Sequence, residues 1–281
     1  MTTTKTLPAL FISHGAPLFA IEPGSTGPAL TRWGQELQLR ETGPEAGLRG
    51  VVIMSPHWMA RGPAVMSGPA PETWHDFGGF PSELYKLQYP APGKPALAAD
   101  VQTLLVKAGL VSTSDDARPF DHGAWVPLMH LFPKADVPVV QVALPSGYGP
   151  AQVYAMGQAL RSLRAQGILV VGSGSMTHNL SEFFGGARAP APAPYVTEFS
   201  RWVEAAIGRG DLTALLDYRH QAPHAQRAHP SEDHFLPLFF ALGASGWGAA
   251  VEAGRGEPVK ASYLSREVMH GILAMDSFAL A

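Results

Sequence analysis

The sequence predicts an α/β fold with a largely parallel or mixed sheet. Short apolar runs rich in β-branched residues alternate along the chain with long stretches of helical periodicity. Apolar residues make up 46% of the 281 residues, which is enough to bury a large core. No change in composition marks a boundary, so residues 1–281 are expected to form a single domain.

Five apolar runs are predicted to be buried strands, because each is short and bounded by glycine or proline. They span residues 9–13, 50–55, 137–144, 167–173 and 248–254. Proline has no N–H to donate to a sheet, so Pro56 is expected to end the second strand and direct His57 toward a cleft.

Helical periodicity falls between these strands and is bounded by typical start and stop residues. The predicted helices span residues 95–110, 149–167, 195–210 and 232–245. Pro95 fits a first helical position, and Gly167 fits a helix end. The segment 61–94 is rich in proline, glycine and aromatic residues without periodicity. It is therefore expected to be an elaborated loop that shapes a binding site.

Composition excludes several classes of function. Charged residues make up only 15% of the chain and the formal net charge is −3, so no nucleic-acid partner is expected. No apolar run approaches the roughly 20 residues of a membrane span, and the short run broken by Pro8 and His14 is not expected to be a signal sequence. A cytoplasmic protein with no membrane partner is expected. The chain has no cysteine, so any metal must be held by His, Asp or Glu.

Histidines follow several of the predicted strands. His14, His57 and His178 each follow an apolar run, while His122 lies in "FDHGAWVPL" and His234 in "HPSEDHF". Ligands of open α/β sheets bind beyond the carboxyl ends of strands, so these five side chains are expected to meet there. The carboxylates nearest in sequence could be ligands or could hold a histidine tautomer. They are Glu22, Asp121, Glu232 and Asp233.

Other patterns favour less specific interpretations. His75, His130 and His270 are expected to be ordinary loop or surface residues. His220 and His224 would share a helix face and could bind a metal, but solvated polar side chains are the more typical outcome. Ser173 or Ser175 beside a histidine is a weak hydrolase signal, and the chain lacks a GxSxG elbow.

Taken together, five motifs resemble a known family. They are "FISHGAP" (11–17), "SPHW" (55–58), "DHGAWVPL" (121–128), "GSGSMTHNL" (172–180) and "AHPSEDHFLPL" (228–238). This set resembles the DODA-type class III extradiol ring-cleavage dioxygenases, a 4,5-DOPA extradiol dioxygenase-like family related to the catalytic subunit of protocatechuate 4,5-dioxygenase. The resemblance implies one catalytic domain with a central mixed sheet flanked by helices on both faces.

The resemblance also implies roles for individual residues. His14, His57 and His234 match the metal ligands. His178 matches the acid/base histidine, which in some zinc-loaded members also approaches the metal as a fourth ligand, and His122 matches a further catalytic histidine. The residues expected to line the substrate pocket are His229, Trp58 and Trp125.

A site of three histidines does not by itself define the metal. The protocatechuate enzymes use two histidines and a glutamate, whereas three histidines are also a catalytic zinc pattern. The family implies Fe(II) for activity with a catechol and O2, and Zn(II) is expected to bind readily in the purified protein. Two alternatives stay open: a zinc-dependent hydrolase using the same histidines, and a non-enzymatic binding protein. The sequence leaves a homo-oligomer open and does not define the catechol.

Overall fold

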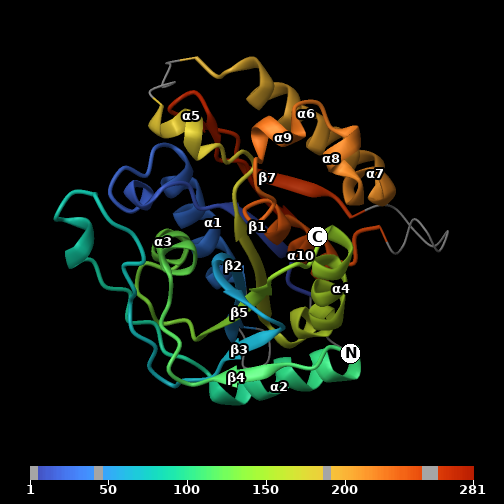
Figure 1. Cartoon of the computed structure of the whole chain (residues 1–281). Coiled ribbons are helices and arrows are strands. Elements are labelled where there is room, and N and C mark those ends of the chain that lie inside the picture. The colour runs from blue at the N-terminus through green and yellow to red at the C-terminus, as the bar shows by residue number, and fades with distance from the viewer. Residues whose placement is uncertain (1–5, 41–46, 186–190, 249–258) are drawn as a thin grey trace.

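A large mixed sheet forms the centre of the molecule. The computed structural model describes residues 6–40, 47–185, 191–248 and 259–281. Within them, eight strands pair in the order β4-β3-β5-β2-β6-β1-β10-β7 (Figure 1). Their bounds are Ala9–Ser13 (β1), Gly50–Ala60 (β2), Ala64–Met66 (β3), Thr113–Asp115 (β4), Val139–Pro145 (β5), Ile168–Gly174 (β6), Ala261–Ser265 (β7) and Ser277–Leu280 (β10). The four central strands β5, β2, β6 and β1 are parallel, and β10 runs antiparallel to β1.

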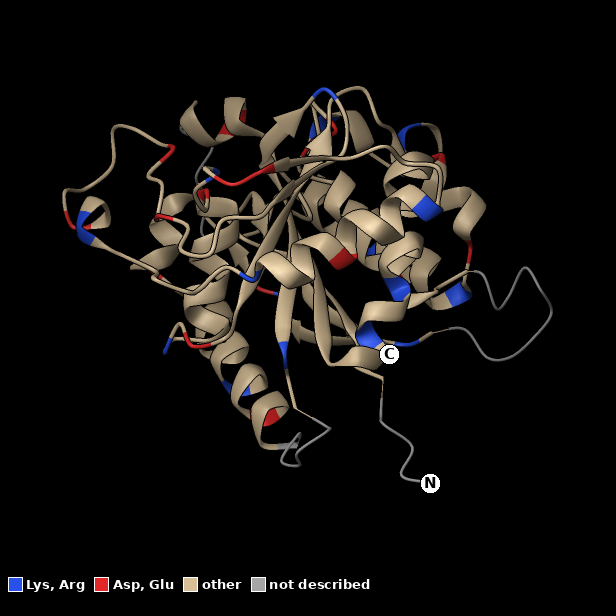
Figure 2. Ribbon diagram, turned by 90° about the horizontal axis from the view of Figure 1, so that it is seen from below, with Lys and Arg blue, Asp and Glu red and all other residues tan. Residues whose placement is uncertain are grey.

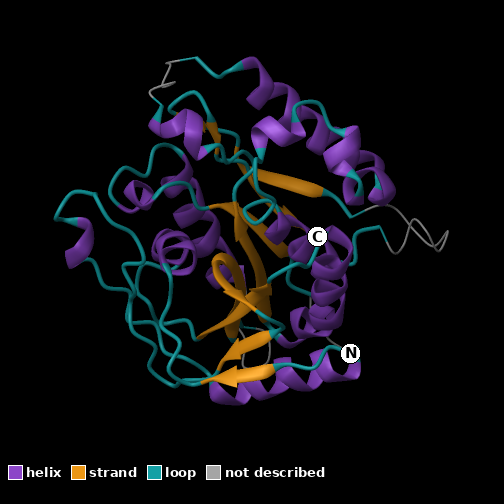
Figure 3. Ribbon diagram, in the orientation of Figure 1, coloured by secondary structure: helices purple, strands orange, loops and turns teal. Residues whose placement is uncertain are grey.

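Alternation along the strands creates two apolar cores. In β1, Leu10 and Ile12 belong to one core, while Ala9 and Phe11 belong to the other. The first core is covered by α1 (Thr26–Arg40) and α3 (His122–Leu131). The second is covered by α2 (Pro95–Lys107), α4 (Pro150–Leu160) and α10 (Leu236–Ser245). Helices therefore flank both faces of the sheet (Figure 3), which confirms the predicted single-domain fold class.

A group of helices follows β6 and lies together at one end of the molecule (Figure 1). The group comprises α5 (Leu180–Phe184), α6 (Pro194–Arg209), α7 (Leu212–Leu216), α8 (Tyr218–Gln221) and α9 (Ala225–Ala228). Single 3-10 turns occur at Pro17–Ala20, Leu84–Lys86 and Arg161–Gln166, and β8 (Val268–Met269) pairs with β9 (Leu273–Ala274). Basic and acidic residues are interspersed along the ribbon in Figure 2.

Most predicted elements are confirmed, with shifted ends. Four of the predicted strands correspond to β1, β2, β5 and β6, and the helices at 95–110, 149–167 and 195–210 correspond to α2, α4 with its 3-10 extension, and α6. The helix predicted from residue 232 begins only at Leu236, because residues 231–235 form turns. The strand predicted at 248–254 lies outside the described residues except for Gly248, which is in a turn.

The expectation that Pro56 ends a strand is wrong. Strand β2 continues to Ala60, and its pairing with β5 shifts between Ser55 and Met59. Ser55 lies opposite Ala143 and Met59 lies opposite Leu144, so the intervening residues of β2 have no partners and form a bulge. A bulge accepts a proline because its unpaired position needs no N–H donor. The bulge, rather than a strand end, is what presents His57.

Candidate metal centre

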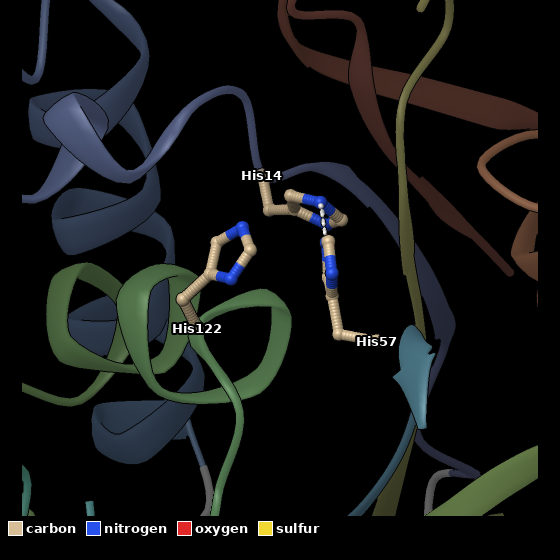
Figure 4. Close-up of side chains that lie close together, drawn as sticks. All are labelled: His14, His57 and His122. Atoms are coloured by element: carbon tan, nitrogen blue, oxygen red, sulfur yellow. Dashed lines mark hydrogen bonds between the residues drawn. The ribbon is translucent and has the colours of Figure 1, made fainter. Parts of the chain in front are cut away.

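Four histidines from four separate segments meet beside the carboxyl ends of β1 and β2. His14 directly follows β1, His57 lies in the β2 bulge, His122 is the first residue of α3, and His234 precedes α10. The ring of His57 has its centroid 5.2 Å from that of His14, 3.9 Å from His122 and 5.0 Å from His234. Figure 4 shows His14, His57 and His122 converging from their elements. The structure thus gathers side chains that the sequence separates by up to 220 positions.

Two pairs of Nε2 atoms among these rings have the spacing of ligands around one ion. His57 Nε2 lies 3.3 Å from His14 Nε2 and 3.2 Å from His234 Nε2. Two nitrogens that each lie about 2.1 Å from an ion are about 3.0 Å apart at a right angle and about 3.4 Å apart at the tetrahedral angle. The two distances observed fall between these values, so His57 lies at ligand spacing from both His14 and His234.

Hydrogen bonds on the far side of two rings fix their tautomers. Ser173 Oγ donates its single proton to the carbonyl of Gly123, so it accepts a hydrogen bond from His14 Nδ1–H at 3.0 Å. His234 Nδ1 donates to Asp233 Oδ2 at 2.5 Å. With Nδ1 protonated in both rings, the Nε2 of each carries a lone pair directed at His57. Such acceptors holding the distal nitrogen are characteristic of metal-bound histidines.

A carboxylate from the long loop contacts the other two rings. Asp76 Oδ1 accepts hydrogen bonds from His122 Nδ1 at 3.0 Å and from the His122 backbone N–H at 2.8 Å. Its second oxygen lies 3.7 Å from His57 Nδ1. Sequence reasoning missed Asp76, because it lies in the aperiodic segment 61–94. The prediction that this loop shapes a binding site was the sequence feature that could have pointed to Asp76.

Two glycines allow the segments to approach. A Cβ at Gly123 would collide with Ser55 Oγ and lie 2.8 Å from His57 Cδ2, so only glycine lets the first turn of α3 reach the β2 bulge. Gly15 turns the chain immediately after His14 with φ of 63°, a conformation that side chains other than glycine rarely adopt. Both glycines lie next to histidines of the cluster and set where their rings lie.

Burial keeps His14, His57 and His234 uncharged. Burial, followed by the nearby His57, lowers the pKa of His14 well below its usual value. The pKa of His234 is lowered in the same way, first by burial and then by His178. Burial and the proximity of His122 lower the pKa of His57 to about 3, despite the opposing charge of Asp76. Neutral imidazoles are the form that binds a metal, so the site is ready for a cation at neutral pH.

His178 lies against the cluster without joining the converging nitrogens. Its ring stacks on His234 with centroids 3.5 Å apart and planes 8° from parallel. Among the described residues its ring makes no hydrogen bond. Burial lowers its pKa to about 4, while Asp233 opposes the shift. His178 is therefore a neutral, half-buried imidazole whose ring nitrogens are not engaged by the part of the chain that the structure describes.

The remaining candidate carboxylates have other contacts. Asp121 is fully buried, caps α3 by accepting from the Ala124 N–H, and binds Arg118 and Gln141. Glu232 accepts from the Tyr218 hydroxyl, and Glu22 is exposed. Of the four carboxylates singled out from the sequence, only Asp233 touches a ring of the cluster.

The residues expected to line the pocket lie at different depths. His229 is fully buried beside Phe235 and donates from Nε2 to the Met176 carbonyl. Trp125 is fully buried and donates to the Trp74 carbonyl, while Trp58 is 7% exposed and lies 4.9 Å from the Arg118 guanidinium carbon. His229 and Trp125 are therefore fully buried, whereas Trp58 keeps slight exposure, and their part in lining the pocket stays a prediction.

The other histidines lie outside the cluster. His75 and His130 bind backbone carbonyls of Leu87 and Phe19, and His270 packs on Phe183. His220 and His224 do not share a site, because each binds its own carboxylate on the surface: Asp217 and Glu198, respectively. Among the described residues, one group of three side chains could hold a metal ion by ring nitrogens that lie within 4.8 Å of one another. It consists of His14, His57 and His122.

Comparisons with known proteins agree with this site. The family described as the catalytic LigB subunit of aromatic ring-opening dioxygenase matches residues 8–269, so the chain belongs to this family. It is 37% identical over 247 residues to the 4,5-DOPA dioxygenase extradiol of Beta vulgaris, covering 86% of this chain and 88% of that protein. It is 37% identical over 250 residues to the protein of the same name from Escherichia coli K12, covering 87% of each.

A solved structure confirms the fold. The crystal structure of an uncharacterized protein from Escherichia coli K12 is 28% identical, with a TM-score of 0.74 over 98% of this chain and 100% of that one. The family and the relatives together define an aromatic ring-opening dioxygenase of the extradiol type. None of the described helices is both long and apolar enough to cross a membrane.

Proposed function

We propose that this protein opens the ring of a catechol with O2, using Fe(II) held by His14, His57 and His234. The observation that supports this proposal is the convergence of three Nε2 atoms at 3.2 and 3.3 Å, with the far nitrogens of two rings engaged by Ser173 and Asp233. When bound, Fe(II) supplies the redox chemistry by which O2 reacts with an aromatic ring. The relatives named 4,5-DOPA dioxygenase extradiol support a catechol as the substrate class.

Within this proposal, His234 rather than His122 is the third ligand. His234 Nε2 lies at ligand spacing from His57 Nε2. The ring of His122 instead lies over that of His57, with centroids 3.9 Å apart and planes 45° from parallel. Its Nδ1 is held by Asp76, which leaves Nε2 to hydrogen-bond a substrate or oxygen atom beside the ligands. His122 is therefore assigned to the substrate side of the site.

His178 is assigned the transfer of protons. A catechol hydroxyl must lose a proton as the substrate binds, and a neutral imidazole accepts it. His178 is uncharged, reaches the cluster through its stack on His234, and has no competing protein partner for its ring among the described residues. The same ring can later return the proton, so one residue serves as base and then as acid. If His178 instead bound the metal as a fourth ligand, its ring would not be available for this proton transfer.

Reconstitution tests the proposed function directly. Metal-free protein is loaded anaerobically with Fe(II), mixed with a simple catechol and exposed to air, while O2 uptake and visible absorbance are followed. A yellow ring-opened product formed with one O2 consumed per catechol is expected. Protein loaded with Zn(II) serves as the control and should consume no O2. Absence of uptake with every catechol, combined with Zn(II)-dependent ester or amide cleavage, would instead establish the hydrolase alternative.

A further inference from the structure

The Asp76 carboxylate reaches two rings of the cluster at once. One oxygen accepts from both N–H groups of His122, and the other faces His57 Nδ1 at 3.7 Å. Its side chain is 8% exposed, so the contacts are shielded from water. A charged acceptor in such surroundings orients donors strongly, because few solvent dipoles compete.

Both contacts favour the tautomer that directs Nε2 into the cluster. Since a carboxylate only accepts hydrogen bonds, His122 must carry its proton on Nδ1 when bound to Asp76. The negative charge beside His57 Nδ1 favours a proton there as well. The Nε2 atoms of both rings are then lone-pair donors, one toward the metal position and one toward the substrate side.

Asp76 is held in place by several contacts of its loop with α3 and the chain leading to it. Thr73 forms a β-bridge with Phe120, and the Trp74 N–H donates to the Phe120 carbonyl at 2.8 Å. Trp125 Nε1 donates to the Trp74 carbonyl at 3.0 Å. The residues before Asp76 are thus fixed to the same helix that carries His122.

The cation of Arg118 connects this loop to the β2 bulge. Its guanidinium carbon lies 4.9 Å from the centroid of the Trp58 ring and 5.0 Å from that of Trp74. It also donates to the carbonyl of His57 and to Asp121. The loop, the bulge and the start of α3 therefore form one connected unit around the Asp76 carboxylate.

We infer that Asp76 is a positioning residue that sets the tautomers of His57 and His122 together, and so couples metal affinity to the substrate side of the site. The inference rests on the proposed function for the roles of the two rings. It does not rest on a change of protonation of Asp76. The long loop thereby contributes to the metal centre itself as well as to the substrate pocket.

The test uses the full-length protein, freed of metal and titrated with Zn(II) against a chromophoric chelator. Asp76→Asn keeps the shape of the side chain but removes its charge, and is expected to weaken Zn(II) binding about 10- to 100-fold. Asp76→Glu restores the charge and should recover part of the affinity. Asp217→Asn is the matched control, because Asp217 accepts from exposed His220 Nδ1 at 2.6 Å, outside the cluster. This variant should bind Zn(II) like the wild type.

A second readout reports on His122 without any catechol. Long-range 1H–15N spectra of the zinc-loaded wild type should show His122 protonated at Nδ1, and Asp76→Asn should show a mixture of tautomers. Wild-type His122 protonated at Nε2 would overturn the inference even if the variant failed to fold. Zn(II) affinity in Asp76→Asn within twofold of the wild type would overturn it equally. Neither measurement depends on O2 uptake, so a failure of the proposed function is detected separately.

Discussion

Two pairs of acidic and histidine side chains in this protein have nearly the same contact geometry but very different surroundings. His234 Nδ1 lies 2.5 Å from Asp233, and His220 Nδ1 lies 2.6 Å from Asp217. The side chain of His234 is 7% exposed, whereas that of His220 is 82% exposed. Only in the buried pair does the opposite nitrogen face another histidine, His57 at 3.2 Å.

The difference shows that a metal centre depends on convergence and burial rather than on a histidine–carboxylate pair. Around His220, water competes for every polar atom, and such surface pairs contribute little. Around His234, the carboxylate fixes a tautomer because the ring has no alternative partner in solvent. The following predictions test this contrast, starting with the largest expected effect.

Removing a central ligand should abolish metal binding. His57→Ala removes the nitrogen that lies at ligand spacing from both His14 and His234. These two ligands then remain without the histidine that lies next to both of them. Metal content after Fe(II) or Zn(II) loading, measured by elemental analysis, is expected to fall to background. A variant that still held one equivalent of metal would show that His57 is not a ligand.

Replacing His178 should separate chemistry from binding. His178→Gln removes the proposed acid/base group but leaves the three converging Nε2 atoms in place. Turnover of a catechol by the iron-loaded variant is expected to fall about 100-fold or more, while metal content stays near one equivalent. Wild-type turnover in the variant would remove His178 from the mechanism, and loss of the metal would support the fourth-ligand role.

These two predictions concern residues that the sequence identified, and the reason is physical. His14 follows β1, and every residue of that strand is buried, so its pattern is unambiguous. His57 was identified even though Pro56 was misjudged, because a bulge accepts a proline as readily as a strand end does. The resemblance of the motifs to a family predicts the ligands, but it does not reveal whether the chain between them turns or continues.

Other parts of the fold left weaker signals in the sequence. Helix α3 is buried over most of its length, so it shows no alternation of apolar and polar faces. The C-terminal strand β10 contains Ser277 and ends at Leu280, and its antiparallel pairing with β1 depends on residues more than 260 positions apart. Asp76 is invisible to periodicity because a loop delivers it. Its contact with His122 exists only in three dimensions.

Adding a methyl group at Gly123 should weaken metal binding and lower stability without removing a ligand. Gly123→Ala places a methyl group against Ser55 Oγ and 2.8 Å from His57 Cδ2, so α3 and the bulge must separate. Overpacking of this kind costs about 1 to 3 kcal/mol. Urea unfolding of the metal-free protein measures that cost, and Zn(II) competition should show reduced affinity. Gly62→Ala, at a position with open space, is the control and should change neither.

Acid should destabilise the metal-free protein through its buried histidines, and the Asp276 carboxyl, whose pKa is raised by burial to about 6, offsets part of this effect. Burial lowers the pKa of His57 and His229 to about 3 and that of His178 to about 4, against about 6.5 in the unfolded chain. Between these values the unfolded state binds protons that the folded state does not, so stability falls as pH falls from 6.5 toward 4. Each such histidine contributes up to about 1.4 kcal/mol per pH unit. Urea unfolding that is independent of pH across this window would contradict the buried, neutral cluster.

The smallest effect is expected at the exposed pair, where the same types of side chain meet in water. His220→Gln removes the contact with Asp217, and His224→Gln removes the contact with Glu198 at 2.8 Å. Because neither histidine shares a ligand position with another, the double variant should retain full metal content and wild-type turnover. Its thermal unfolding midpoint should also stay within experimental error of the wild type. A loss of metal in this variant would mean that surface histidines contribute to binding, and the contrast between buried convergence and exposed pairing would then no longer hold.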